Sequence, residues 1–292
     1  MKKLTRRSFI KKAAGSLLAM AGLGGGTYYY AREIEPYLLQ VNEEDISLPT
    51  ISPAFDQFRI IQFSDTHIGF HYDIQQFQKL VKKINELEPD LIVFTGDLVD
   101  KPHRYDWNEN LTNALRKLQA PFGKYWVYGN HDHGGYGTDK LAEVMESADF
   151  QLLQNSHTVI EKEAERFILA GIDDVVLGRP DISESLQQVN PELFTVMLAH
   201  EPDIADVVAE FPVDVQLSGH SHGGQVQLPF IGHLYTPAFA EKYVEGRYNI
   251  PHHQLSLYVS RGIGTTRLPY RFLCKPEIHV YSLNSSSSAK LS

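Results

Sequence analysis

The sequence predicts an α/β protein built as a two-sheet β-sandwich with helices on its outer faces. In the first half, segments with apolar residues at helical spacing alternate with short apolar runs typical of buried strands. In the second half, apolar runs follow one another with few helical segments between them. Together these two patterns predict a layered arrangement with α+β character, in which two sheets pack face to face.

The first half of the globular body is expected to alternate strand and helix. Asp73 is an expected helix N-cap and Pro89 an expected stop, because a short polar side chain satisfies the first turn and proline cannot continue a helix. Pro121 ends the next helix in the same way. The expected strands are 58–64, 91–95 and 125–128, and the expected helices are 74–87, 111–118 and 138–145.

The second half is expected to consist mainly of strands. One short helix, 203–210, interrupts them, and the Ser-rich tail 285–292 is expected to be disordered because it has little apolar surface to bury. The expected strands are 166–170, 195–199, 214–217, 225–228, 256–260 and 278–283.

The N-terminus has the layout of an export signal. Residues 1–30 begin with basic residues and continue with a weakly apolar stretch rich in Gly and Ala, and Arg6-Arg7 resembles a twin-arginine signal. The apolar stretch is short for a membrane span, although Tyr28-Tyr29-Tyr30 could extend it, so cleavage and anchoring both stay open. Residues 31–56 are interpreted as a linker and first strand, and 57–284 as the functional domain.

Composition excludes several classes of partner and site. Residues 1–26 contain six Lys and Arg and no acid; removing these six from the 27 basic residues leaves 21 against 36 acidic ones, a net charge of −15. Such a body repels nucleic-acid backbones, so no nucleic acid is expected as a partner. The single cysteine, Cys274, excludes a cysteine-rich zinc site and is expected to be buried and inert.

Metal-type side chains follow five apolar runs. Residues two apart on an extended backbone point the same way, so Asp65 and His67 can share one ion, as can His220 and His222. The carboxyl ends of strands are also where open α/β sheets bind ligands. The five stretches are Asp65-Thr66-His67, Gly96-Asp97, Gly129-Asn130-His131-Asp132, Ala199-His200 and Gly219-His220-Ser221-His222.

These five stretches resemble the signature of the calcineurin-like metallophosphoesterases. With the twin-arginine signal, Gly223-Gly224-Gln225 and Ser260-Arg261-Gly262-Ile263-Gly264, the whole chain resembles an exported, YkuE-type branch of that family. The resemblance covers about residues 58–283 and implies the calcineurin-like phosphoesterase fold.

The resemblance also implies a ligand set for two divalent metal ions, with Mn, Zn or Fe as candidates for nitrogen and oxygen ligands. Asp97 would bridge the ions, and a hydroxide shared by them would attack a phosphoryl group. One ion would be held by Asp65, His67 and His222, and the other by Asn130, His200 and His220.

Further residues are assigned to substrate chemistry. His131 would stabilise phosphoryl oxygens or protonate the leaving group, with Asp132 orienting it; a role for His131 as a third ligand to the second metal is the alternative. Gly134-Gly135-Tyr136-Gly137 is either a flexible wall of the site or an ordinary turn. Substrate phosphate would be bound by one or more of Arg261, Arg267 and Arg271.

The expected function is phosphodiester or phosphomonoester hydrolysis outside the cytoplasmic membrane, after export by the twin-arginine machinery. Cell-wall or lipid-linked phosphates are candidate substrates, and the protein would be in the cell wall, extracellular, or membrane-anchored facing outward. A non-catalytic metal-dependent binding module is the alternative; a metallo-β-lactamase-type hydrolase would need an H-x-H-x-D-H run, which the sequence lacks. Six further histidines have no second metal-type residue at ligand spacing in the sequence, and they are interpreted as structural or solvated: His71, His103, His133, His233, His252 and His253.

Overall fold

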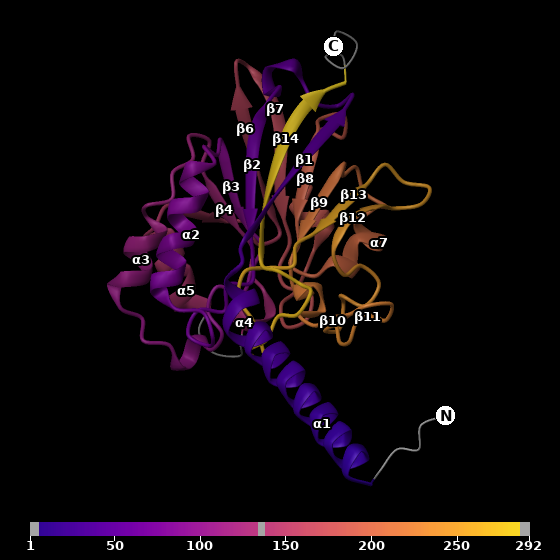
Figure 1. Cartoon of the computed structure of the whole chain (residues 1–292). Coiled ribbons are helices and arrows are strands. Elements are labelled where there is room, and N and C mark those ends of the chain that lie inside the picture. Colours follow the sequence, from indigo (N-terminus) through magenta and orange to yellow (C-terminus); the bar gives the residue numbers. More distant parts are fainter. Residues whose placement is uncertain (1–5, 134–137, 287–292) are drawn as a thin grey trace.

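The structure is a computed structural model that describes residues 6–133 and 138–286. Two six-stranded sheets lie face to face with helices on their outer faces, which confirms the predicted sandwich (Figure 1). The expected glycine-rich wall, 134–137, lies outside the described residues, as do residues 1–5 and 287–292.

The first sheet is mostly parallel and is covered by three helices, α2 (Ile74–Glu86), α3 (Glu109–Leu115) and α5 (Thr138–Glu146). Helix α2 begins with a full capping box, in which Asp73 Oδ1 accepts from Gln76 N and Gln76 Oε1 accepts from Asp73 N. The strand order is β1 (Gln40–Leu48), β14 (Glu277–Ser285), β2 (Phe58–Phe63), β3 (Leu91–Phe94), β4 (Lys124–Trp126) and β5 (Phe150–Leu152).

The second sheet is covered by two short helices, α6 (Ile182–Ser185) and α7 (Ala205–Val208). Two further elements lie near the carboxyl ends of the strands: helix α4 (Asn130–His133) and the hairpin of β10 (Gln227–Leu228) and β11 (Gly232–His233) (Figure 1). The strand order is β12 (Gly246–Asn249), β13 (Ser256–Val259), β9 (Val215–Ser218), β8 (Thr195–Leu198), β7 (Glu165–Gly171) and β6 (Ser156–Lys162).

Alternation of side chains along the strands builds three apolar layers. In β2, Ile60 faces the second sheet while Ile61 and Phe63 face helices α2 and α3. In β8, Val196 faces the first sheet and Met197 faces α7. Because both faces of these strands are buried, their sequences are mainly apolar, with Arg59 and Gln62 as the polar exceptions in β2, and this makes the strands predictable from sequence.

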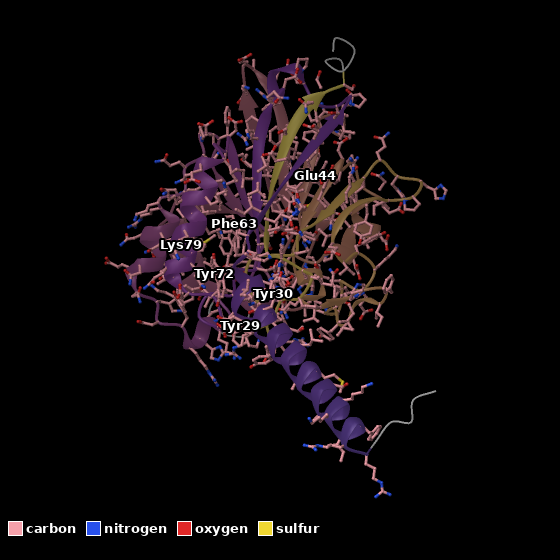
Figure 2. All side chains as sticks on the ribbon, viewed as in Figure 1. Tyr29, Tyr30, Glu44, Phe63, Tyr72 and Lys79 are labelled. Atoms are coloured by element: carbon pink, nitrogen blue, oxygen red, sulfur yellow. The ribbon has the colours of Figure 1, made fainter. Side chains whose placement is uncertain are left out.

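The N-terminal helix α1 (Arg6–Tyr29) extends away from the sandwich (Figure 1), and Tyr29 and Tyr30 lie where it joins the body (Figure 2). The junction is fixed, because Arg271 N donates to Ala31 O at 2.9 Å and the Tyr28 ring lies 5.5 Å from that of Tyr270. Within residues 6–133 and 138–286, no helix is both long and apolar enough to cross a membrane.

Several elements differ from the expectation. The strands β5, β6 and β12 and the short helices α4 and α6 were not predicted. Strand β1 pairs in parallel with β14 over nine residues, although its sequence is largely polar. Strand β14 continues to Ser285, one residue into the expected tail. Strands β1, β6 and β12 are edge strands with at least one solvated face, so they carry few of the apolar residues that mark buried strands.

Candidate metal centre

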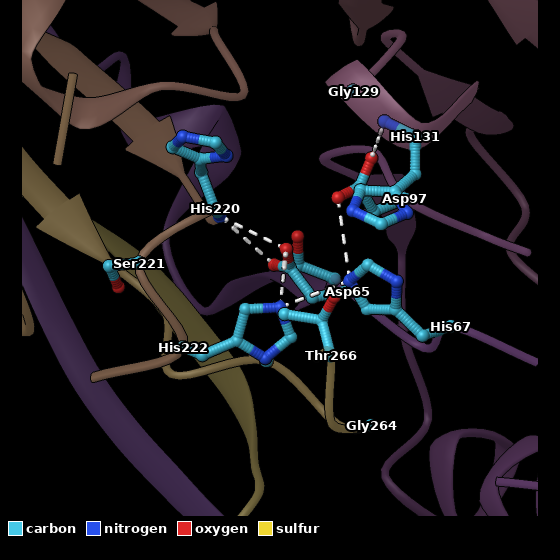
Figure 3. Close-up of polar contacts among 12 residues, drawn as sticks. Asp65, His67, Asp97, Gly129, His131, His220, Ser221, His222, Gly264 and Thr266 are labelled. Carbon is cyan, nitrogen blue, oxygen red and sulfur yellow. Dashed lines mark hydrogen bonds and ion pairs between the residues drawn. The ribbon is translucent and has the colours of Figure 1, made fainter. Parts of the chain in front are cut away.

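Polar side chains at one end of both sheets converge on a single region. Strands β2, β3, β4, β8 and β9 each end shortly before the residues concerned. This is the end of the molecule at which α4 and the β10–β11 hairpin lie (Figure 1). The converging residues are Asp65, His67, Asp97, Asn130, His131, His200, His220 and His222. Figure 3 shows six of them: Asp65, His67, Asp97, His131, His220 and His222.

The first group consists of Asp65, His67 and His222, whose ligand atoms lie within 4.8 Å of one another. His67 Nε2 lies 3.0 Å from His222 Nε2, and His222 Nε2 lies 3.5 Å from Asp65 Oδ1. Two imidazole nitrogens and a carboxylate oxygen that face one point are a typical donor set for Zn, Mn or Fe.

The second group consists of Asp97, His200 and His220. His200 Nε2 lies 3.1 Å from His220 Nδ1 and 3.4 Å from Asp97 Oδ2. The same Asp97 oxygen also lies 3.4 Å from His67 Nε2, in the first group. Asp97, a member of the second group, therefore also lies close to the first group.

Asn130 lies beside these groups and lines the same cavity. Its Oδ1 atom is buried and has no hydrogen-bond partner among the described residues. An unpaired buried amide oxygen is costly unless something else satisfies it, and a metal ion would do so. The donor set therefore fits divalent metal binding.

Backbone carbonyls fix the orientation of two of the histidines. His200 Nδ1 donates to Thr95 O at 2.6 Å, which leaves Nε2 facing the site. His220 Nε2 donates to Ala238 O at 2.9 Å, which leaves Nδ1 facing it. Such contacts select the tautomer and ring orientation that a metal needs.

The backbone at the centre is strained. A positive φ is unfavourable for residues with a side chain and costs on the order of 1–3 kcal/mol each, so the surrounding structure must hold it. Gly96 also has φ +97°, and a Cβ there would lie 2.6 Å from His200 Nδ1 and 2.7 Å from Gly129 N, which excludes any side chain. Five of the candidate ligands have such a φ, between 43° and 66°: Asp65, His67, Asp97, His220 and His222.

Burial and mutual charge set the protonation of these side chains. Burial alone would raise the pKa of Asp97, but the combined positive charges of His200, His131 and His67, with a hydrogen bond from His200, outweigh burial and hold that pKa well below its usual range. Burial likewise opposes protonation of His200, but Asp97 raises its pKa well above its usual value. Burial and then the charge of His200 lower the pKa of His220 to about 3. An Asp97 anion beside a cationic His200 therefore faces a neutral His220.

His131 lies at the cavity, where it is held by Asp100. Its backbone N donates to Asp97 Oδ1 at 2.8 Å, and its Nδ1 donates to Asp100 O at 2.8 Å. Asp132, which the sequence analysis assigned to orienting His131, instead accepts from the backbone N atoms of Asp97, Leu98 and Gly129. Asp132 thus joins the two site loops. Asp100 was missed, although it follows Asp97 by three residues in the same segment.

The three candidate arginines have different surroundings. Arg271 is fully buried and donates to backbone carbonyls, including those of Gly264 and Cys274, so it holds its own loop together rather than facing substrate. Arg261 is paired with the buried carboxylate of Glu277. Arg267 alone of the three lines the cavity, where its guanidinium lies 4.9 Å from the centre of the Tyr235 ring.

The remaining sequence expectations concern single residues. His133 Nε2 lies 2.7 Å from Asp173 Oδ1, which is a structural contact. His71 lies 5.8 Å from the Tyr37 ring. Cys274 is buried, and burial raises the pKa of its thiol to about 11.

A sandwich whose strand ends gather histidines and carboxylates in two adjoining groups defines a metal-dependent hydrolase of phosphoric esters. Residues 58–224 match the calcineurin-like phosphoesterase family, and the chain therefore belongs to that family. This confirms the resemblance stated on the five sequence stretches.

Three relatives illustrate the family likeness. The chain is 44% identical to the uncharacterized metallophosphoesterase YkuE of Bacillus subtilis, over 98% of this chain and all of that protein. It is 28% identical to the UDP-2,3-diacylglucosamine pyrophosphatase LpxG of Chlamydia trachomatis, over 86% of this chain and 91% of that one. It is also 28% identical to the phosphodiesterase YaeI of Escherichia coli, over 96% of this chain and 99% of that one.

Proposed function

We propose that the chain hydrolyses phosphate mono- or diesters with the help of two divalent metal ions. The observation that carries this proposal is the position of Asp97 Oδ2, which lies 3.4 Å from both His67 Nε2 and His200 Nε2. One carboxylate is thereby shared by two donor groups. The first ion would be held by Asp65, His67 and His222, the second by Asn130, His200 and His220, and both by Asp97.

The chain's own residues provide charge and orientation. Two bound divalent ions, with Mn, Zn and Fe as candidates, supply Lewis-acid activation of water and of phosphoryl oxygens. Asp97 offsets part of their charge. His131 is held by Asp100 O through Nδ1, so its Nε2 is the ring nitrogen available to a phosphoryl oxygen or a leaving group. Arg267 offers a guanidinium in the lining of the same cavity.

We also propose that the protein acts outside the cytoplasmic membrane on cell-wall or lipid-linked phosphates. The basic start of the chain, with Arg6-Arg7, supports export by the twin-arginine machinery. The relative LpxG, by its name, acts on a diacylated sugar nucleotide, which favours envelope substrates. Cell fractionation tests the location of the protein. Substitution of Arg6 and Arg7 by Lys is expected to abolish export. A wild-type protein found wholly in the cytoplasm would exclude the proposed location.

The activity itself is tested with metal-stripped protein reloaded in turn with Mn, Zn, Fe and Mg. Hydrolysis of 4-nitrophenyl phosphate is compared with that of bis(4-nitrophenyl) phosphate, in the wild type and in Asp97→Ala. Asp139→Asn, an exposed carboxylate of α5, is the matched control. Metal-restored turnover that is lost only in Asp97→Ala supports the enzyme. Binding of metal without turnover of either ester would favour the alternative, a metal-dependent binding module.

A further inference from the structure

The cavity at the metal centre has two chemically different walls. It has a volume of about 500 Å³. One wall carries Asp97, Asn130, His131, His220 and His222. A second set of lining residues, the apolar wall, consists of Val226, Leu234, Tyr235, Pro237 and Leu268, with Gln225, Thr266 and Arg267 beside them in the sequence. A ligand that fills this space must present a group for metal ligands on one side and hydrocarbon on the other.

The apolar wall is built by the β10–β11 hairpin and the segment 266–268, and hydrogen bonds hold the two together. Leu234 N donates to Val226 O at 3.1 Å, which closes the base of the hairpin. Gln227 N donates to Phe272 O at 2.8 Å, and Thr266 N donates to Gln225 Oε1 at 2.8 Å. The two segments that build the wall are therefore fixed relative to each other.

This wall is exposed to solvent despite its apolar character. Leu234 and Leu268 are 56% and 58% exposed. At the hairpin tip, Phe230 is fully exposed and Ile231 is 71% exposed. Clustered exposed apolar side chains beside a binding cavity mark a surface that contacts another apolar body.

The same surface is continuous with the root of α1. Phe272, which pairs with the base of the hairpin, lies 6.4 Å from the Tyr30 ring. Helix α1 thus leaves the body next to the hairpin (Figure 1). It carries exposed apolar residues such as Leu23 and basic residues such as Arg7, and no acidic residue. The basic residues, with no acidic residue to offset them, give α1 a positive charge that attracts it to an anionic lipid surface.

We propose that the substrate is an amphiphilic phosphate ester whose phosphoryl group lies at the metal ligands and whose alkyl chain lies along Val226, Leu234 and Leu268. The proposal rests on the proposed function and narrows it to substrates with hydrocarbon close to the phosphate. The alkyl chain belongs to a molecule of a lipid bilayer. Phe230 and Ile231, at the hairpin tip, contact that bilayer.

Binding of alkylphosphonates to the Mn²⁺-loaded full-length protein tests the proposal without requiring turnover, because their C–P bond is not an ester. Calorimetry compares methyl-, butyl-, hexyl- and octylphosphonate below their micelle concentrations. We expect each methylene to gain about half of the free energy of its full transfer from water to hydrocarbon. Binding then tightens about twofold per CH₂, and thus on the order of 100-fold from methyl to octyl. Equal affinities along the series, or no binding of octylphosphonate, would overturn the proposal.

Variants assign the effect to the wall. Leu234→Ser with Leu268→Ser is expected to reduce the octyl-to-methyl affinity ratio at least tenfold. Leu177→Ser is the matched control, because Leu177 has a similar exposed fraction of 55% and does not line the cavity. An unchanged ratio in the double variant contradicts the proposal. A flat series in a protein that still hydrolyses 4-nitrophenyl esters removes this inference and leaves the proposed function standing.

Liposome flotation distinguishes a bilayer from a free amphiphile as the source of the chain. Wild type is expected to float with phosphatidylglycerol vesicles, and Phe230→Ser with Ile231→Ser is expected to reduce the floated fraction several-fold. The octylphosphonate affinity of this variant serves as the check that its cavity is intact. Equal flotation of variant and wild type would overturn the bilayer contact by the hairpin.

Discussion

His131 Nδ1 lies 2.8 Å from the backbone carbonyl oxygen of Asp100 and 3.7 Å from its carboxylate Oδ1. This contact fixes the ring, because the Nδ1 proton has a fixed acceptor and Nε2 becomes the nitrogen that faces outward. Burial would lower the pKa of His131, but the charges of Asp97 and Asp100 outweigh it and raise that pKa. A raised pKa favours the cationic form of His131, which suits both stabilisation of phosphoryl oxygens and donation of a proton.

The His131 assignment predicts a loss of turnover without a loss of metal. His131→Ala is expected to lower kcat by about 10²–10⁴-fold, the usual size of a general acid contribution, while the metal content stays at the wild-type value. Steady-state kinetics and elemental analysis of the same preparations check both. The exposed His252→Ala is the control. A variant that loses metal in parallel with activity would instead indicate that His131 is a ligand.

The unpaired Oδ1 of Asn130 predicts an effect confined to the metal-bound protein. Asn130→Ala removes no hydrogen bond to that oxygen, so the Tm of the metal-stripped protein is expected to stay within about 2 °C of wild type. The rise in Tm on adding metal is expected to shrink, because ligand-linked stability falls with affinity. In the control Asn155→Ala, whose Oδ1 accepts from Asp173 N and Asp181 N, the metal-stripped Tm itself should fall. An undiminished metal shift would exclude Asn130 as a ligand.

The raised pKa of His200 predicts that metal binding strengthens with pH. Below this pKa the imidazole carries a proton that a metal ion must displace. The affinity for the metal is therefore expected to fall as pH decreases from 8 to 6, by about tenfold per pH unit for each proton displaced. Metal titrations at several pH values measure the slope, and calorimetry in buffers of different ionisation enthalpy counts the protons released. Affinity that does not change over this range would contradict a protonated His200.

The sequence predicted those parts of the fold and site that depend on local pattern. Strands such as β2 and β3 are buried on both faces, so their apolar runs are visible without the structure. The candidate ligands follow these runs directly, and Asp97 Oδ2 lies 3.4 Å from a nitrogen of His67 and of His200. Within each sheet, the shared location of the ligands follows from the rule that parallel strands end at the same edge. The meeting of the strand ends of both sheets does not follow from that rule.

Contacts between distant segments could not be read from local pattern. Arg271 resembles any exposed arginine in sequence, yet it is buried among the carbonyls of its loop. Asp132 follows His131 directly, but in helix α4 its side chain turns toward the backbone of Asp97 and Leu98. Strand β1 gains its backbone partners from β14, more than 200 residues away, and needs no apolar alternation to do so.

The ring cluster between the sheets predicts a large loss of stability on truncation. Phe167 is 1% exposed, and its ring centre lies 5.0 Å from that of Phe55 and 5.8 Å from that of Phe58. Phe167→Ala is expected to lower the free energy of unfolding by about 3–5 kcal/mol, because the cavity cannot collapse between two sheets. Urea unfolding measures the change. Phe230→Ala, which truncates a fully exposed ring, should change stability by at most about 0.5 kcal/mol.

Glu277 predicts a pH-dependent contribution to stability. It is 2% exposed, and its carboxylate accepts from Arg261 Nε at 2.6 Å and from His279 Nε2 at 2.9 Å. Burial would raise the pKa of Glu277, but these two partners outweigh it and lower that pKa to about 2. The unfolded chain has the ordinary glutamate pKa of about 4.3. The carboxylate therefore stabilises the fold by about 3 kcal/mol above the unfolded-state pKa, and this contribution is lost as pH falls toward 2.

Glu277→Gln keeps the size of the side chain and removes its charge, which isolates this contribution. At pH 7 the variant is expected to unfold in urea with a free energy about 3 kcal/mol below that of wild type, and the difference is expected to narrow as pH falls from about 4.3 toward 2. Glu192→Gln, an exposed carboxylate, should match wild type at every pH. A deficit of the same size at pH 7 and at pH 3 would show that Glu277 stabilises the fold through its packing and neutral hydrogen bonds, because only an ionic contribution disappears when the wild-type carboxylate takes up a proton.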